Sequence, residues 1–252
     1  MSRSGPGSGA VALVGCHRSW QWLGGLGRRL GRLYRHSPAV VLASTLTVSM
    51  CCSLVAFSEI TEDSAVTSVY GEQGRERVEQ WHALIARLQG APVARQLAGV
   101  NDFFNRLAFR DDREVWQVRD YWATPREFLG VGAGDCEDFA MAKYETLRRL
   151  GVPDSSMRLN YVKYRPWDQF HMVLTWFKSS AATPLVLDNI NGEIVPATLR
   201  SDLLPIYSFN GSSLWLEQRG SGGQRVGDAS RLSQWDAWQM RLNDGTLRAP
   251  PR

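Results

Sequence analysis

The stretch from Gly134 to Leu150, GDCEDFAMAKYETLRRL, constrains the fold of this chain more than any other. Small or apolar residues recur along it at helical spacing, at Cys136, Ala140, Tyr144 and Leu147. This spacing predicts a helix with one face packed inward and Cys136 in its first turn. Backbone N–H groups at a helix start lack intrahelical partners and carry the positive end of the dipole, which favours a thiolate. The stretch therefore predicts either a nucleophilic cysteine or a small buried cysteine behind a Gly134-Asp135 cap.

The N-terminal residues, before about residue 58, predict export. From Pro38 to Phe57 the sequence carries no charge, and it is preceded by six arginines and by no acidic residue. A basic flank before about twenty apolar residues is typical of a signal peptide, or of a membrane anchor whose N-terminal side stays in the cytoplasm. Cleavage and retention both stay open. The sequence predicts that the chain from Glu59 onward is periplasmic or otherwise outside the cytoplasm.

Composition and charge predict a folded domain without a nucleic-acid partner. The chain is 44% hydrophobic and 21% charged, as in ordinary globular proteins. Its net charge of +4 arises from the N-terminal arginines, so the remainder is near neutral and shows no basic patch. We expect a basic arm with a signal peptide or anchor over 1–58, a single globular domain over 59–218, and a polar tryptophan-containing tail over 219–252.

The distribution of cysteines along the chain favours Cys136 as a nucleophile. Cys16, Cys51 and Cys52 precede or lie within the apolar segment, which leaves Cys136 as the only cysteine of the exported part. A single cysteine in an oxidising compartment cannot form an intramolecular disulfide, and its free thiol is a liability unless its reactivity is used. This argues against a mere packing role for Cys136.

The periodicity of the chain changes after the central helix. Before it, apolar residues three and four apart predict a helix up to the break at residues 90–92 and a second helix over Val93–Phe109, followed by a loop over Asp111–Gly132. After Gly151-Val152-Pro153, alternating and β-branched runs predict strands. These strands are Met157–Tyr164, His171–Phe177, Pro184–Asn189, Pro205–Asn210 and Leu214–Leu216. Helices followed by an antiparallel sheet make an α+β fold.

The strand pattern places a histidine beside a carboxylate. His171 opens one predicted strand and Asp188 closes the next, so antiparallel pairing brings both to one edge of the sheet. A thiolate nucleophile needs such a base and such an orienting partner. If the central helix packs on this sheet, Cys136 completes the set. The sequence therefore predicts Cys136 as nucleophile, His171 as base and Asp188 as its partner, with the N–H groups at the helix start holding the oxyanion.

These motifs together resemble a known family. GDCEDFAMAKYETLRRLGV, then HMVL, LVLDN and the PIYSFN and LWL segments after residue 204, resemble the bacterial transglutaminase-like cysteine proteinases of the LapG type. The resemblance covers roughly Trp116–Leu216. It implies a papain/transglutaminase-like fold, with the nucleophile helix packed on an antiparallel sheet, and the triad Cys136, His171 and Asp188. It further implies a periplasmic endopeptidase that cuts the N-terminal region of a large RTX-type surface adhesin near paired alanines. This cleavage would release the adhesin and promote biofilm dispersal. The resemblance also implies that an inner-membrane cyclic di-GMP receptor inhibits the enzyme.

The resemblance also implies bound calcium, with Asp135 and Glu137 as ligands and Asp138 as a third candidate. Physical chemistry agrees, because three carboxylates around Cys136 raise the pKa of its thiol unless a divalent cation neutralises them. Oxygen ligands of this kind suit calcium. The alternative is that these acids are ordinary residues of a helix N-terminus.

Two other functions stay open at this point. The same nucleophile could transfer its acyl group to an amine, as in a transglutaminase, and nothing in the residues separates water from amine as the acceptor. The domain could also be a transglutaminase-like module that only binds. The complete triad argues against the binding module, since binding needs neither Cys136 nor His171.

Overall fold

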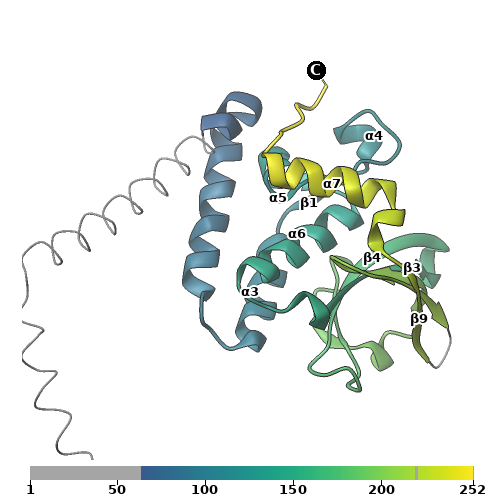
Figure 1. Cartoon of the computed structure of the whole chain (residues 1–252). Coiled ribbons are helices and arrows are strands. Elements are labelled where there is room, and N and C mark those ends of the chain that lie inside the picture. The colour runs from purple at the N-terminus through teal and green to yellow at the C-terminus, as the bar shows by residue number, and fades with distance from the viewer. Residues whose placement is uncertain (1–63, 219–220, 252) are drawn as a thin grey trace, which may run out of the picture. The chain divides into compact units, whose positions relative to one another are not determined.

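The helix that carries the cysteine lies at the centre of the fold. α6 (Cys136–Arg149) packs against the sheet on one side and against neighbouring helices on the other (Figure 1). In the computed structural model, which describes residues 64–218 and 221–251, every residue of α6 from Asp138 to Leu147 is buried. The prediction of a single inward face was too narrow, because other helices cover the side of α6 that points away from the sheet.

The helical part precedes α6 in the chain, with one helix added at the C-terminal end. It consists of a helix over residues 64–88, α3 (Val93–Phe104), α4 (Asp112–Val115), α5 (Pro125–Val131) and α7 (Ser233–Asp244). The second predicted helix ends at Phe104 and not at Phe109, because Ala108–Phe109 forms the short strand β1. β1 pairs in parallel with β2 (Ala133–Gly134), so this pairing fixes the backbone directly before α6.

The predicted loop over Asp111–Gly132 is wrong in part, since it contains α4 and α5. α5 begins in a capping box, in which Thr124 N donates to Glu127 Oε2 at 2.7 Å and Glu127 N donates to Thr124 Oγ1 at 3.4 Å. Pro125 is the first helical residue, a position that proline favours. The sequence TPRE carries this helix-start signal, which the surrounding aromatic residues obscured.

The sheet confirms the α+β plan. Seven antiparallel strands lie in the order β6-β5-β4-β3-β7-β8-β9. Their bounds are β3 (Met157–Tyr164), β4 (Gln169–Trp176), β5 (Leu185–Leu187), β6 (Val195–Pro196), β7 (Leu203–Phe209), β8 (Leu214–Gln218) and β9 (Ser221–Gly227). The central strands β3 and β4 pair along their full length, and α6 packs against β4. The two predicted strands correspond to β4, which carries His171, and to its neighbour β5, which ends one residue before Asp188.

The C-terminal residues, which the sequence set apart as a polar tail, are part of the same compact unit. β9 extends the sheet, and α7 lies over the helical part (Figure 1). Trp235 and Trp238 stack at a centroid distance of 5.2 Å, and both are buried in the core. Trp238 Nε1 also donates to Ala123 O at 3.0 Å. The tail thereby contacts the segment that leads into α5.

The predicted export segment at 38–57 lies outside the described residues. Within 64–218 and 221–251, no helix combines the length and apolar character that crossing a membrane requires.

Removing the indole of Trp238 tests whether the tail belongs to the fold. Trp238 is 0% exposed, so Trp238→Ala should lower the free energy of unfolding by about 3–5 kcal/mol, through lost burial and a residual cavity. Met240→Ala on the same helix is the control, since Met240 is 67% exposed and its loss should cost about 0.5 kcal/mol or less. Denaturant unfolding measures both. Equal, small effects would show that α7 adds nothing to stability.

Candidate active site

The position of Cys136 is set by close backbone packing before α6. β2 ends at Gly134, where a Cβ atom would overlap the Asp138 carboxylate, so this position needs glycine. Asp138 is fully buried, and it accepts hydrogen bonds from Ala123 N at 2.7 Å and from Asp135 N at 3.3 Å. The acid at the third position of α6 therefore ties the helix start to the segment before α5. Cys136 follows as the first residue of α6.

His171 and Asp188 form the pair that the strand pattern predicts. His171 Nε2 lies 2.7 Å from Asp188 Oδ1, and both side chains are buried. Burial by itself raises the pKa of Asp188, but hydrogen bonds from His171, Ile190 N and Arg200 outweigh it and lower the pKa to about 2. The ionised carboxylate can only accept, so Nε2 carries the proton of the pair. The other ring nitrogen, Nδ1, is left for a further partner.

Cys136 and His171 line one cleft. Its volume is about 470 Å³, and its wall is formed by Phe109, Cys136, Tyr164, Trp167, Gln169, Phe170, His171, Asn189 and Ile190. Phe109, Trp167 and Phe170 are largely exposed at its rim. Apolar walls with a few polar groups are typical of sites that bind organic ligands. The cleft thus brings the sulfur and the imidazole to a surface that is open to a substrate.

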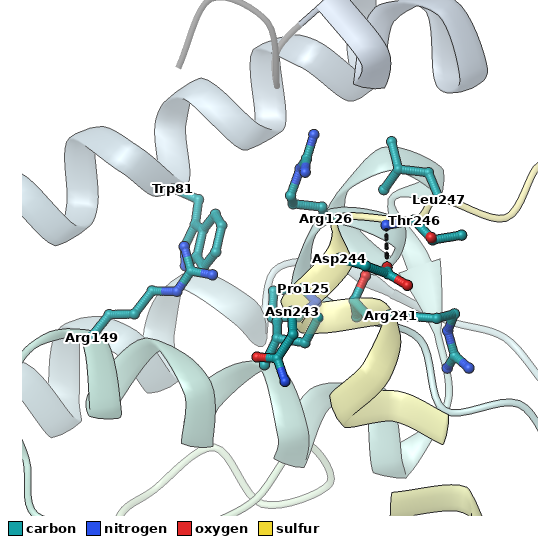
Figure 2. Close-up of a pocket in the computed structure, with 12 residues that line it drawn as sticks. Trp81, Pro125, Arg126, Arg149, Arg241, Asn243, Asp244, Thr246 and Leu247 are labelled. Carbon is teal, nitrogen blue, oxygen red and sulfur yellow. Dashed lines mark hydrogen bonds between the residues drawn. The ribbon is translucent and has the colours of Figure 1, made fainter. Parts of the chain in front are cut away.

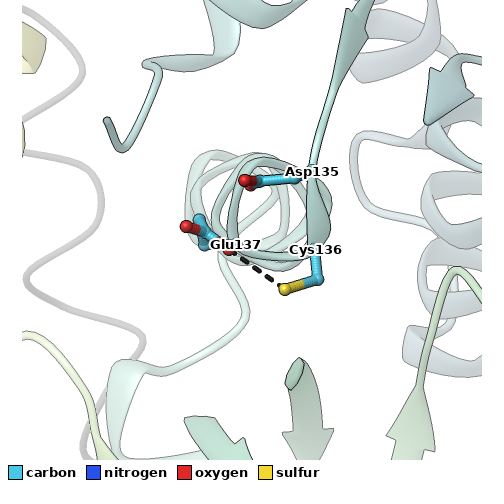
Figure 3. A group of neighbouring side chains, drawn as sticks. All are labelled: Asp135, Cys136 and Glu137. Atoms are coloured by element: carbon cyan, nitrogen blue, oxygen red, sulfur yellow. Dashed lines mark hydrogen bonds between the residues drawn. The ribbon is translucent and has the colours of Figure 1, made fainter. Parts of the chain in front are cut away.

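The surroundings of the thiol oppose its ionisation in the protein alone. Burial, followed by the charges of Glu137 and Asp135, raises the pKa of Cys136 well above its ordinary value, while the N–H of Met172 works in the opposite direction. The sulfur lies 3.0 Å from Glu137 Oε2, as Figure 3 shows in a view along the helix. An active thiolate at this position requires that the neighbouring carboxylates be neutralised.

Five carboxylates converge at the start of α6. The sequence predicted Asp135, Glu137 and Asp138 there, and the fold adds Asp112 from α4 and Asp120 from the loop that follows it. Ligand atoms of Asp112, Asp120 and Glu137 lie within 4.8 Å of one another, and so do those of Asp112, Asp135 and Asp138. We call these five residues the carboxylate cluster.

The carboxylate cluster fits a hard divalent cation. Asp112 Oδ1 and Asp135 Oδ1 are buried and have no hydrogen-bond partner among the described residues. Burial, followed by the charge of Glu137, raises the pKa of Asp112 to about 7 and raises that of Asp135 far above its ordinary value. Such a site costs free energy unless protons or a cation neutralise it. Oxygen donors without imidazole favour calcium over zinc.

A second hollow lies apart from these residues. Its volume is about 130 Å³, and it lies beside the start of α5 and the C-terminal end of α7 (Figure 2). Its arginines already have protein partners. The Arg149 guanidinium lies 4.7 Å from the Trp81 ring, and that of Arg241 lies 4.5 Å from Tyr121. This hollow lies between the C-terminal tail and the helical part, where the two pack against each other.

Comparison with known proteins decides the family. The sequence model of the bacterial transglutaminase-like cysteine proteinases, BTLCP, matches residues 75–201, about half of the chain. This chain belongs to that family. Among solved structures, the proteinase is similar to EGTA-treated Legionella pneumophila LapG, with a TM-score of 0.65, 38% identity, and coverage of 72% of this chain and 96% of that one. A comparison with curated protein sequences finds no match.

A further solved structure bears on the metal. Calcium-bound Legionella pneumophila LapG matches the proteinase with a TM-score of 0.63 and 37% identity, over 73% of this chain and 98% of that one. LapG has thus been observed in both a calcium-bound and an EGTA-treated form. The papain/transglutaminase-like fold expected from the sequence is confirmed by these likenesses.

Some residues of the site carry no signal in the sequence. Asp112 and Asp120 lie in a run of mixed polar and aromatic residues, and only the folding of α4 brings them to the start of α6. Arg200 contacts Asp188 at 2.7 Å from a segment twelve residues further along the chain. Asn105, at the end of α3, donates to Asp188 O at 2.8 Å. Each of these contacts depends on tertiary structure and not on spacing.

Neutralising Asp112 should stabilise the metal-free proteinase in a pH-dependent way. An ordinary aspartate ionises near 3.8, whereas burial raises the pKa of Asp112 to about 7, so without a cation the fold loses stability as the pH rises between these values. In excess EGTA we expect Asp112→Asn to raise the melting temperature more at pH 8 than at pH 5. Thermal unfolding at both pH values measures this difference.

Asp102→Asn is the matched control, since Asp102 is an exposed acid of α3 outside the carboxylate cluster. It should shift the melting temperature little, and equally at both pH values. If Asp112→Asn shifted the melting temperature equally at pH 5 and pH 8, the pKa of the Asp112 carboxyl could not be raised by its burial.

Proposed function

We propose that this proteinase is a calcium-dependent cysteine endopeptidase in which Cys136, His171 and Asp188 form the catalytic triad. The observation that carries the proposal is the His171–Asp188 hydrogen bond at 2.7 Å, on a cleft that Cys136 also lines. Membership in a cysteine proteinase family supports the same reaction class. A protein that only binds would need neither the buried imidazole–carboxylate pair nor a cysteine at the helix start.

The geometry supports the following mechanism. Asp188 holds the Nε2–H of His171, and Nδ1 takes the proton of the Cys136 thiol. The thiolate attacks the scissile carbonyl carbon, and N–H groups at the start of α6 stabilise the oxyanion. The imidazolium then protonates the leaving amine, and His171 afterwards activates the water that hydrolyses the thioester. Transfer to an amine in place of water is the alternative outcome of the same acyl-enzyme.

Asp112, Asp120, Asp135 and Glu137 are the residues that we propose to hold calcium. Both oxygens of Asp138 already accept backbone hydrogen bonds, so its part as a ligand rests on an additional lone pair. Bound calcium would supply positive charge beside Cys136 and cancel the carboxylates that oppose thiolate formation. The solved calcium-bound form of LapG supports calcium as the metal.

The substrate and the cellular setting follow from the family resemblance and from the N-terminal sequence. We propose cleavage of the N-terminal region of a large RTX-type adhesin in the periplasm, which releases the adhesin and disperses biofilm. An inner-membrane cyclic di-GMP receptor is the proposed inhibitor. The apolar segment at 38–57, preceded by arginines, supports export by a signal peptide or an N-terminal membrane anchor.

Variants of the triad test the reaction. With an adhesin N-terminal fragment as substrate, Cys136→Ala and His171→Ala should each lower the cleavage rate by at least about 10³-fold, because the nucleophile and its base act as a unit. His82→Ala is the matched control, because His82 lies beside Trp81 in the helix over residues 64–88, away from the cleft. Its rate should stay within about twofold of that of the unaltered chain. Full cleavage by Cys136→Ala would exclude the proposed mechanism.

Metal removal tests the calcium requirement. EGTA should abolish cleavage, and calcium should restore it, whereas magnesium should not, because magnesium demands a smaller and more regular octahedral site. Asp135→Asn should raise the calcium concentration for half-maximal activity by about tenfold or more, equivalent to ~1.4 kcal/mol of binding. Glu145→Gln, an acid near the other end of α6, should leave that concentration unchanged. Undiminished cleavage in EGTA would refute the requirement.

A further inference from the structure

Arg200 contacts Asp188 on the oxygen that His171 leaves free. It follows the 3-10 helix Ala197–Leu199 and is only 4% exposed. Its Nη2 donates to Asp188 Oδ2 at 2.7 Å and to Asp202 Oδ2 at 2.8 Å, while its Nε donates to Asp202 Oδ1 at 3.0 Å. Each oxygen of Asp188 therefore has its own charged or polar partner, His171 at Oδ1 and Arg200 at Oδ2.

The burial of Asp188 demands a permanent counter-charge. Asp188 is only 1% exposed, and burying its negative charge costs free energy unless a positive charge or hydrogen bonds compensate it. His171 supplies a positive charge only while it is protonated, whereas a guanidinium stays charged at every pH at which the protein is folded. Arg200 thus compensates Asp188 both before and after His171 takes up the proton of the thiol.

The same contacts fix the direction of the carboxylate. Asp188 follows β5 and is not held by strand pairing of its own. Its backbone O accepts from Asn105 Nδ2 at 2.8 Å, and its Oδ1 also accepts from Ile190 N at 3.0 Å. With Oδ2 bound to Arg200, rotation of the carboxylate away from His171 breaks a buried ion pair. Asp202 holds Arg200 in place from the other side.

A second buried cation, Lys143 of α6, is also close enough for Asp188 to affect its titration. Burial lowers the pKa of Lys143 to about 7, against the opposing effect of Asp188. Lys143 is therefore charged in only part of the molecules near neutral pH. Within the described residues, no hydrogen bond joins Lys143 to the Asp188 carboxylate. Arg200 is the partner with both permanent charge and direct contact.

We propose that Arg200 is a positioning residue of the active site, which keeps Asp188 ionised and turned so that Oδ1 accepts the Nε2–H of His171. Nδ1 of His171 is then left to face the thiol of Cys136. Arg200 lines no part of the substrate cleft and acts through Asp188 alone. This inference rests on the triad proposed above and assigns a fourth side chain to it.

A double-mutant cycle in single-turnover cleavage of the adhesin fragment tests this role. Arg200→Gln should lower the cleavage rate constant about 10- to 100-fold, because a small displacement of catalytic groups has effects of this size. The substrate concentration for half-maximal rate should change less than about twofold, since Arg200 does not touch substrate. In the Asp188→Asn background the same substitution should cost less than about threefold, because its target carboxylate is gone.

Arg158→Gln is the matched control. Arg158 and Arg200 line one hollow of about 250 Å³ on the sheet, and Asp188 is not among its lining residues. Arg158 forms an ion pair with Glu217 at 3.7 Å. Its cleavage rate should stay within about twofold of that of the unaltered chain. Melting temperatures of all variants show that each is folded. If Arg200→Gln does not fold, Arg200→Lys runs the same cycle, with a smaller loss because it keeps the charge but lacks the planar fork.

The outcomes separate this inference from the proposed triad. A large loss for Arg200→Gln that disappears in the Asp188→Asn background supports the positioning role. Equal losses in both backgrounds, or no loss while Asp188→Asn is inactive, would overturn it and leave the triad intact. Full activity of Asp188→Asn itself would instead overturn the triad on which the inference rests.

Discussion

The chemistry of this site is limited by a thiol at the start of α6, where five carboxylates converge and two of them, Asp112 and Asp138, are buried. The dipole of α6 favours a thiolate at Cys136, but burial, followed by the charges of Glu137 and Asp135, raises the pKa of that thiol. Asp112, Asp120 and Asp138 place further carboxyl groups around the same helix start. Left uncompensated, this arrangement produces an inert cysteine. In the proposed mechanism a bound calcium ion would reverse this balance and make activity conditional on the metal.

The two halves of the site come from the two parts of the fold, and α6 joins them. The sheet provides His171 from β4 and Asp188 after β5, with Arg200 as the proposed support. The helical part provides the carboxylates, and Asp138 ties it to α6 through Ala123 N. The C-terminal segment reaches the same region, since Trp238 donates to Ala123 O. The tail therefore helps to hold the backbone that positions the carboxylate cluster.

Much of this architecture could be predicted, because it depends on local periodicity and on pairs of neighbouring strands. The alternation of Met157–Tyr164 gave the bounds of β3, and the antiparallel neighbours β4 and β5 brought His171 to Asp188. Contacts between distant segments could not be predicted in this way. Asp112 reaches Asp135 and Asp138 only because α4 packs against β2, directly before α6. The tail tryptophans are buried by partners that no local pattern identifies.

Site-specific alkylation of Cys136 measures whether calcium controls the ionisation of its thiol. The full chain is treated with iodoacetamide at neutral pH in calcium or in EGTA, and mass spectrometry locates the adduct, which separates Cys136 from the three N-terminal cysteines. We expect fast modification of Cys136 in calcium and at least about tenfold slower modification in EGTA, because thiolate, and not thiol, is the nucleophile. Equal rates of modification in calcium and in EGTA would contradict this expectation.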